Sequence, residues 1–508
     1  MSFNILNQVI KLETNYVDIK ELVNTDENLL RCSKVTYFKN EVNIRPTFAG
    51  DTLIYLFVYK DKIFITNNIQ KHNVKFDLDL NAIGSILNWG IIPFPHTPFK
   101  NVYRLGIGQD CTIKNESFNA KIIINQKHFF NKNEIVVNDN FDEKKFEQLF
   151  IKYFEKEIVN SEETVSMTSA GKDSTLIAII CSILDYKKIN FVTYNDKSTL
   201  DETLYSKLIC EKLNLKFTKI NSIIDKNFFE KIDSTFVNAF FPVVDNATIP
   251  YLFCANSFKH KVNQIIDGMG NDIYLGHILN NKSKLKNILN NIGKILPNKT
   301  YNYSRISNLR YFFRPKQLNF LPSNYFNYGE LNSFINFDYN FNWLENVFII
   351  PNKKLDLMYF KALTRGVHYD YGVAMEKNRF VCAGLSASPI FPWTNTKISK
   401  YLFNLKSENK FIKEINKVCI RGYLNHKIDY KSYNIPKTGF GFESEKFILQ
   451  NKNEIYDNII ACKYFNKDIL VNTLDKNLSL LKKNKKYGSA LIGLYIVSKW
   501  LNKCKYIN

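Results

Sequence analysis

The stretch that decides the fold reads Ser169-Ala170-Gly171-Lys172-Asp173-Ser174-Thr175. A short β-like run, 164–168, precedes it, and an apolar stretch beginning at Leu176 follows it. Small residues in a turn let the backbone approach a phosphate, and the N–H groups at the start of a helix point at such an anion. The order of strand, turn and helix therefore predicts that the loop 169–175 binds the phosphates of a nucleotide.

The side chains of this loop suit a nucleotide and its cation. Ser169, Ser174 and Thr175 offer hydroxyl donors. Asp173 offers a carboxylate for a hard cation such as Mg²⁺. The loop is not a Walker A motif, because that pattern has Ser or Thr directly after its lysine, where this chain has Asp173. The alternative is an ordinary polar turn between a strand and a helix.

A second acidic loop, 267–277, follows another strand-like run at 262–266. It is rich in glycine, and Gly270 stands two residues before Asp272. Mg²⁺ keeps some waters and takes few protein carboxylates, so two acidic residues from separate loops are what a Mg²⁺-nucleotide site needs. We expect Asp272 to meet Asp173 across one Mg²⁺–pyrophosphate unit, with Gly270 beside the phosphates. The alternative for Asp272 is a helix cap within a glycine turn.

Strands and helices alternate on both sides of the first loop. The pattern predicts a strand at 164–168, a helix at 174–185, a strand at 189–194, a helix at 201–213 and a strand at 216–219. This order favours a parallel α/β sheet, with the loop at the carboxyl end of the first strand, where open α/β sheets bind ligands.

The remaining chain divides into two predicted domains, 1–138 and 139–508. The first reads as an α+β unit that contains a β-hairpin, 52–66, and a proline-rich loop, 91–99. The second begins with an amphipathic helix at 141–158, carries a variable helical insertion at 278–350, and is mainly helical over its last 150 residues.

Composition narrows the class of protein. The chain has 508 residues, no apolar run long enough to span a membrane, and an N-terminus without the plan of a secretory signal, so we expect a cytoplasmic protein. The nine cysteines form no C-x-x-C pair and read as buried apolar residues. The net charge of +21 invites a nucleic-acid interpretation, but the lysines are dispersed and the densest basic run, 482–486, has no interleaved aromatics, which disfavours it.

The loop 169–175 resembles the S-G-G-x-D-S pyrophosphate loop of ATP pyrophosphatases. Together with the loop 267–277, it is similar to the S-G-G-L-D-S-S and S-G-E-G-S-D-E-L-F-G-G motifs of the asparagine synthetase family. Further similar stretches follow the family's order at 201–208, 242–250, 379–393 and 435–442. The resemblance implies an ATP-pyrophosphatase domain with a helical tail, preceded by a degenerate glutaminase-like domain of the N-terminal-nucleophile type.

The resemblance also implies roles for individual residues. The loop 169–175 would hold pyrophosphate, Asp173 and Asp272 would carry Mg²⁺, and Lys437 would contact the phosphates or the developing charge. The family's glutaminase needs an N-terminal Cys, where this chain has Ser2, and Ser386 stands where the family has a Glu of the amine step. By similarity to the β-lactam synthetase branch, Tyr371 and Glu376 are candidates for the base.

These features predict an ATP-dependent ligase that adenylates a small-molecule or peptide carboxylate, releases pyrophosphate, and couples the acid to an amine with loss of AMP. The nitrogen source stays open between free ammonia, an ammonia- or peptide-supplying partner protein, and an amine within the substrate itself, as in lasso-peptide cyclases and β-lactam synthetases. A non-catalytic or RNA-directed protein that kept the fold is the alternative from another class.

Overall fold

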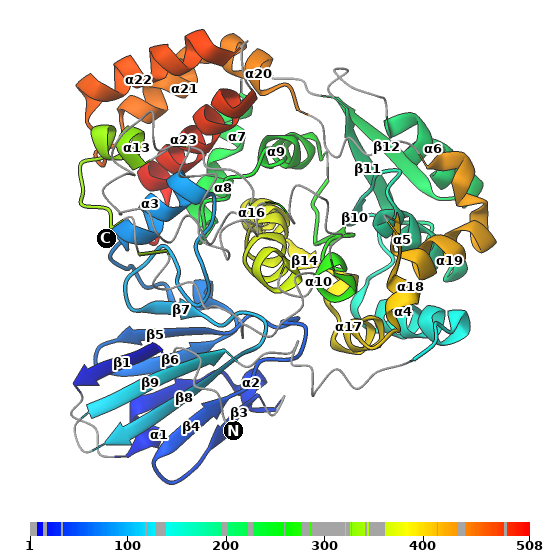
Figure 1. Cartoon of the computed structure of the whole chain (residues 1–508), viewed down its shortest axis with the longest axis horizontal. Helices are drawn as coiled ribbons and strands as arrows, with labels where there is room; N and C mark the ends of the chain where they lie inside the picture. The colour runs from blue at the N-terminus through cyan, green and yellow to red at the C-terminus, as the bar shows by residue number, and fades with distance from the viewer. Residues whose placement is uncertain are drawn as a thin grey trace.

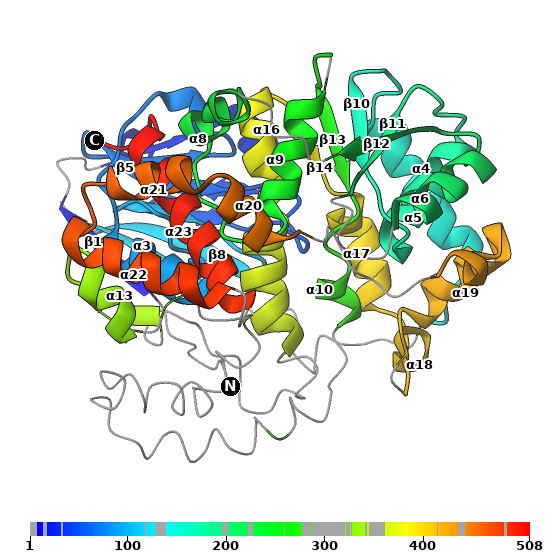
Figure 2. The same cartoon turned by 90° about the horizontal axis from the view of Figure 1, so that it is seen from above.

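A computed structural model describes most of the chain. The described residues are 8–13, 18–31, 34–116, 119–126, 139–195, 202–221, 227–258, 260–276, 285, 321, 326, 328–340, 343–344, 361–413, 415–434, 442–481 and 485–508. Figure 1 shows two N-terminal sheets at one end of the molecule and a third sheet at the other. The C-terminal helices lie beside the N-terminal sheets in this view and in Figure 2.

The third sheet is five-stranded and entirely parallel, as predicted. Its spatial order is β12 (Lys216–Asn221), β11 (Asn190–Asn195), β10 (Thr164–Met167), β13 (Gln264–Asp267) and β14 (Ser388–Ile390). The chain enters at the central strand β10, moves to one edge, and returns to place β13 on the other side of β10. Strand order therefore reverses between β10 and β13, which is where open α/β sheets form a ligand crevice.

Helices cover both faces of this sheet, which explains why its central strand β10 is buried on both sides. In β10, Val165 and Met167 face one core and Ser166 points the other way. The first face packs against α8 (Asp233–Asn238), α9 (Thr248–Ser257) and α16 (Glu376–Leu385). The other packs against α4 (Glu143–Glu157), α5 (Lys172–Ile183), α17 (Thr396–Phe403) and α19 (Val418–Ile428).

The N-terminal residues form two stacked sheets. One is β1 (Gln8–Glu13), β9 (Asn119–Gln126), β8 (Gln109–Glu116), β4 (Glu41–Ile44) and β3 (Val35–Tyr37). The other is β2 (Val23–Thr25), β6 (Lys62–Thr66), β5 (Tyr55–Tyr59) and β7 (Val102–Arg104). The predicted hairpin is confirmed as β5 and β6, joined by Lys60 and Asp61, which both have positive φ.

A helical layer covers the outer face of the second N-terminal sheet. It is built by α3 (Leu80–Trp89), α13 (Tyr328–Phe334), α20 (Ser444–Gln450), α21 (Lys452–Ile460), α22 (Lys467–Leu480) and α23 (Lys485–Lys503). Phe76 also bonds through its backbone N–H to the carbonyl of Tyr506 at 2.8 Å. One apolar core thus runs across the predicted boundary at residue 138. The predicted insertion 278–350 lies largely outside the described residues, and α13 is helical within it.

In the described part of the chain, no helix combines the length and the apolar character required to cross a bilayer.

Candidate functional site

Two loops meet at the point where strand order reverses. The first, 168–171, leaves β10 and enters α5, and the second, 268–271, leaves β13. They touch so closely that a Cβ on Gly268 would lie 2.9 Å from the backbone N of Ser174, so only glycine fits there. Gly270 has a φ of +111°, a conformation that other residues rarely adopt.

The serines of the first loop form hydrogen bonds within the loop. The Ser174 hydroxyl accepts a bond from the Ser169 N–H at 3.1 Å, and the Gly171 N–H donates to the Ser169 hydroxyl at 3.1 Å. The Thr175 hydroxyl donates to the Gly171 carbonyl at 2.8 Å. Gly171 is the N-cap of α5, and no side chain of the described residues caps that helix end. The hydroxyls shape the turn, and the positive end of the helix stays open to an anion.

Two further side chains fix the loop from outside. The Tyr430 hydroxyl donates to the Ala170 carbonyl at 2.7 Å, and the Trp393 indole N–H donates to the Asp173 carbonyl at 3.3 Å. Both come from segments more than 200 residues further along the chain. The backbone of the loop is therefore anchored before any ligand binds.

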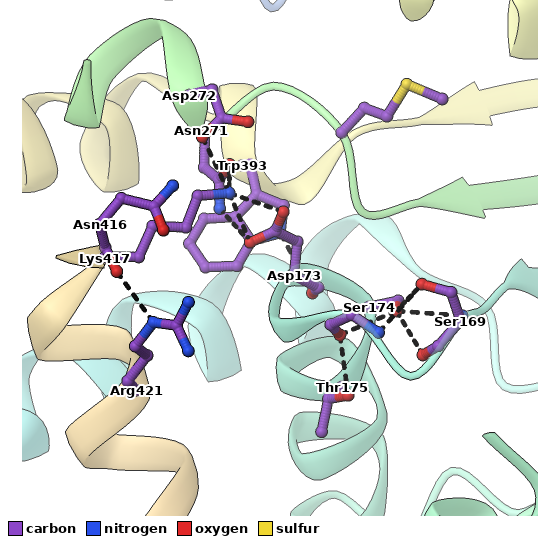
Figure 3. A network of polar contacts seen from close by, with 12 residues as sticks. Ser169, Asp173, Ser174, Thr175, Asn271, Asp272, Trp393, Asn416, Lys417 and Arg421 are labelled. Atoms are coloured by element: carbon purple, nitrogen blue, oxygen red, sulfur yellow. Dashed lines mark hydrogen bonds and ion pairs between the residues drawn. The ribbon is translucent and has the colours of Figure 1, made fainter. Parts of the chain in front are cut away.

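Lys417 lies at the centre of the acidic residues of both loops (Figure 3). Its Nζ is 2.7 Å from Asp173 Oδ2 and 2.9 Å from Asp272 Oδ1. The same ammonium donates to the Asn271 amide oxygen at 2.8 Å, and the Asn271 amide N–H₂ donates to Asp173 Oδ1 at 2.6 Å. Asp173 and Asp272 thus converge on a single cation supplied by the chain.

The three charged side chains of this cluster differ in how far they are exposed to solvent. The Lys417 side chain is 4% exposed, whereas those of Asp173 and Asp272 are 18% and 39% exposed. Burial lowers the pKa of Lys417, but the two carboxylates outweigh it and hold the pKa above its ordinary value. Lys417 also has a φ of +56°, a strained angle for a residue with a side chain. A permanently charged ammonium is therefore held between two partly open carboxylates.

A cavity of about 120 Å³ lies beside this cluster. The loop residues Ala170 to Asp173 line it on one side, together with Asp272. Glu202, Tyr430 and Asn434 line the other sides. The loop backbone, both carboxylates and the buried lysine therefore open onto one small space.

The donor set suits Mg²⁺. Carboxylate oxygens of Asp173 and Asp272 and the amide oxygen of Asn271 all point at one position, and oxygen is the ligand that Mg²⁺ prefers. The described residues contain no group of three or more His, Cys, Asp or Glu side chains that would hold a metal alone. Two carboxylates completed by phosphate oxygens and water would meet the preference of Mg²⁺. Lys417 already stands at the convergence point.

The two candidate bases lie elsewhere, in a buried cluster that we call the Arg104–Glu376–Arg379 cluster. Glu376 Oε2 is 2.7 Å from Arg104 Nη1 and 3.0 Å from Arg379 Nη1. Burial raises the pKa of Glu376, but the two guanidinium groups outweigh it and lower the pKa below its ordinary value. Tyr371 donates its hydroxyl to the Gly50 carbonyl at 2.6 Å, and burial raises its pKa. Neither Tyr371 nor Glu376 lines the 120 Å³ cavity.

Lys437 falls in the segment 435–441, outside the described residues. Asn434, which lines the cavity, comes three residues before it. Sequence reasoning missed Lys417, Asn271 and Tyr430. Asn271 adjoins Asp272 and was within reach of the motif, but nothing in the sequence separates Lys417 from the other lysines of a chain with 69 Lys and Arg.

In comparisons with known proteins, no family model and no curated protein matches this chain.

Proposed function

We propose that this protein is an ATP-dependent carbon–nitrogen ligase that adenylates a carboxylate and transfers the acyl group to an amine. The observation that carries the proposal is the convergence of Asp173 and Asp272 on Lys417, beside the open N-terminus of α5. The arrangement lies at the strand-order reversal, where α/β sheets bind nucleotides. The motif resemblance to asparagine synthetases supplies the reaction class.

In the first step, a carboxylate oxygen of the substrate attacks the α-phosphorus of ATP. A new O–P bond forms, the bond between the α-phosphorus and the bridging oxygen breaks, and pyrophosphate leaves with the electron pair. The first-turn N–H groups of α5 and the Lys417 ammonium stabilise the charge on the leaving pyrophosphate. Mg²⁺, held by Asp173 and Asp272 when bound, supplies further neutralisation of the phosphate charge.

In the second step, an amine attacks the acyl carbon of the adenylate. The C–N bond forms, the bond from the acyl carbon to the AMP oxygen breaks, and the nitrogen loses a proton. The protein acts chiefly by positioning, because the adenylate is already activated. By the family resemblance, Lys437 contacts the phosphates or the developing charge in this reaction.

Exchange of labelled pyrophosphate into ATP tests the first step. The full chain, MgCl₂ and ATP are incubated with amino acids, sugar acids and short peptides, each added singly. We expect exchange that depends on one carboxylate and is absent with the corresponding amide. No exchange with any acid, together with no protection of the chain by ATP against thermal unfolding, would contradict the proposal and favour a non-catalytic protein.

The need for added ammonium, together with the mass of the product, separates the sources of nitrogen once the acid is known. Amide formation that requires added ammonium indicates intermolecular amidation by free ammonia or by ammonia from a partner protein. Loss of one water from the substrate mass without added ammonium indicates an intramolecular cyclase. Both outcomes keep the adenylation step, so they sharpen the proposal rather than replace it.

A further inference from the structure

A second and larger cavity, of about 500 Å³, lies where the N-terminal sheets meet the helical layer. We call it the junction cavity. Its walls come from β5 and the residues that follow β6, from the end of α8 and the segment after it, from α16 and β14, and from Lys505 near the C-terminus. It shares no lining residue with the 120 Å³ cavity of the loop 169–175. The mechanism above makes no use of it.

The walls of the junction cavity carry an excess of positive charge. Among the described lining residues Glu376 is the one carboxylate, and it binds Arg379 of the wall at 3.0 Å and Arg104, which lies outside the lining, at 2.7 Å. Lys505 also lines the cavity, and its Nζ donates to the amide oxygen of Asn238, a neutral partner, at 2.8 Å. One carboxylate is therefore shared by two guanidinium groups, and Lys505 adds a further positive charge at the wall, an excess that attracts an anion.

The guanidinium group of Arg379 is held in place without using all its donors. It stacks on the rings of Tyr371 and Phe391, each 5.0 Å from its Cζ. Its hydrogen bonds, to Glu376 and to the Tyr371 carbonyl, all come from Nη1 among the described residues. The remaining N–H groups form a rigid fork, which suits a planar carboxylate.

The rest of the lining combines aromatic rings with neutral polar side chains, among them Asn67, Asn68 and Gln70. Tyr55 and Phe240 form one wall, with ring centroids 5.7 Å apart in an edge-to-face contact, and Phe380 adds another ring. Ser388 contributes a neutral polar group. A volume of about 500 Å³, lined by aromatic rings and by polar and charged groups, lies within the size range of small-molecule sites.

We propose that the junction cavity binds a small organic carboxylate with an aromatic body. The carboxylate lies against Arg379 and Lys505, and the aromatic body packs against Tyr55 and Phe240. This proposal does not depend on the ligase reaction proposed above, because the two cavities are lined by different residues.

Calorimetry with the full chain tests this site, using phenylacetate and indole-3-acetate as probes and their neutral amides as controls. We expect both acids to bind, and each amide to bind at least about tenfold more weakly, because the amide cannot pair with the cations. Phenyl phosphate serves as a third probe. Tighter binding of the phosphate than of both acids would overturn the choice of a carboxylate, as would equal affinity of acid and amide.

Two variants place the ligand in the cavity. Lys505→Gln removes one cation at the wall, and we expect about a fivefold loss of affinity for indole-3-acetate. Ser388→Trp fills the space from strand β14, and we expect binding to be lost while the thermal unfolding of the chain is retained. The matched control is Lys503→Gln, whose ammonium pairs with Asp233 at 2.9 Å and does not line the cavity.

Unchanged binding in both Lys505→Gln and Ser388→Trp would overturn the proposal, since the probe would then bind at another place. Absence of binding by all three probes at about 10 mM would overturn it as well, because a preformed site of this size binds fragments in that range.

Discussion

The protein contains two three-charge clusters with opposite composition. At the end of the parallel sheet, the two carboxylates of Asp173 and Asp272 share the ammonium of Lys417. At the junction with the N-terminal sheets, Arg104 and Arg379 share the carboxylate of Glu376. The first cluster keeps partly exposed carboxylates beside a cavity. We call the second the closed cluster because its side chains are only 2%, 8% and 11% exposed, although Glu376 and Arg379 border the junction cavity.

This difference in exposure separates two uses of buried charge. A closed cluster cannot exchange its counter-ion with solvent, so its removal is expressed as loss of stability. An open cluster with an excess of carboxylate can take up another cation. Removal of one of its carboxylates is therefore expressed as loss of binding or activity. The following predictions, in order of decreasing effect, test whether the two clusters divide in this way.

Removal of the central anion of the closed cluster should have the largest effect. Glu376→Ala leaves Arg104 and Arg379 buried without their acceptor, and we expect the free energy of unfolding to fall by about 3–5 kcal/mol. Urea denaturation measures it. The control is Glu211→Ala, whose partner Lys207 is half exposed, and whose loss should stay below about 0.5 kcal/mol. A loss as small for Glu376→Ala would show that the closed cluster does not stabilise the junction.

Neutralising the open cluster should affect catalysis instead. Asp173→Asn keeps the side-chain shape but removes a charge, and we expect pyrophosphate exchange to fall about 100-fold. The free energy of unfolding should change by less than about 1 kcal/mol, because the group is partly exposed. Asp475→Asn, at an exposed position on α22, serves as the control. Full exchange activity in Asp173→Asn would remove Asp173 from the proposed site.

Burial near the closed cluster predicts that the free energy of unfolding depends on pH. Burial lowers the pKa of His368 to about 3, and its Nδ1 accepts the Phe94 N–H at 3.4 Å. The unfolded chain takes up a proton near pH 6.5 that the folded chain refuses, so stability is lost as the pH falls below about 6.5 and is unaffected above it. Between about pH 7.5 and 5.0 we expect a loss of about 2 kcal/mol from this residue.

Urea denaturation of wild type and His368→Gln at both pH values isolates this loss, because glutamine takes up no proton. Glu376 is present in both proteins, so its contribution cancels in the comparison. The same pH dependence in both proteins would show that water reaches His368 in the folded chain.

Removal of the Lys417 ammonium should have the smallest of the four effects. Lys417→Met removes the ammonium that competes for the convergence point, and we expect Mn²⁺ to bind about tenfold more tightly to the nucleotide-free chain, as measured by electron paramagnetic resonance. Lys410→Met is a matched control, because Lys410 is equally buried but donates to the Phe403 carbonyl. Weaker Mn²⁺ binding in Lys417→Met would show that the ammonium supports the metal rather than competing with it.

Sequence reasoning predicted the elements that local pattern specifies. Alternation of apolar residues and small-residue turns predicted the central strands, and the helix expected at 174–185 begins two residues earlier because Gly171 serves as its N-cap. The approach of Asp272 to Asp173 followed from the general rule that loops meet at the carboxyl ends of neighbouring parallel strands.

Contacts between segments that are distant in the chain could not be predicted from the sequence. Lys417 pairs with Asp173 across 244 residues, and its identity as a site residue depends on burial that no local pattern reveals. Glu376 appeared as a candidate base through the resemblance to the β-lactam synthetase branch. Its two arginine partners include one on β7, 272 residues earlier, and that contact appears only when the N-terminal sheets are placed against α16.

The separation of 244 residues also orders events during synthesis. Asp173 and Asp272 both leave the ribosome before Lys417 does, and at rates of about 5–20 residues per second the interval between Asp173 and Lys417 is roughly 10–50 seconds. For that period the loop can form with its strands while its carboxylates face any cation in the surroundings. The nascent chain thus passes through a version of its own site in which Asp173 and Asp272 lack their shared partner Lys417.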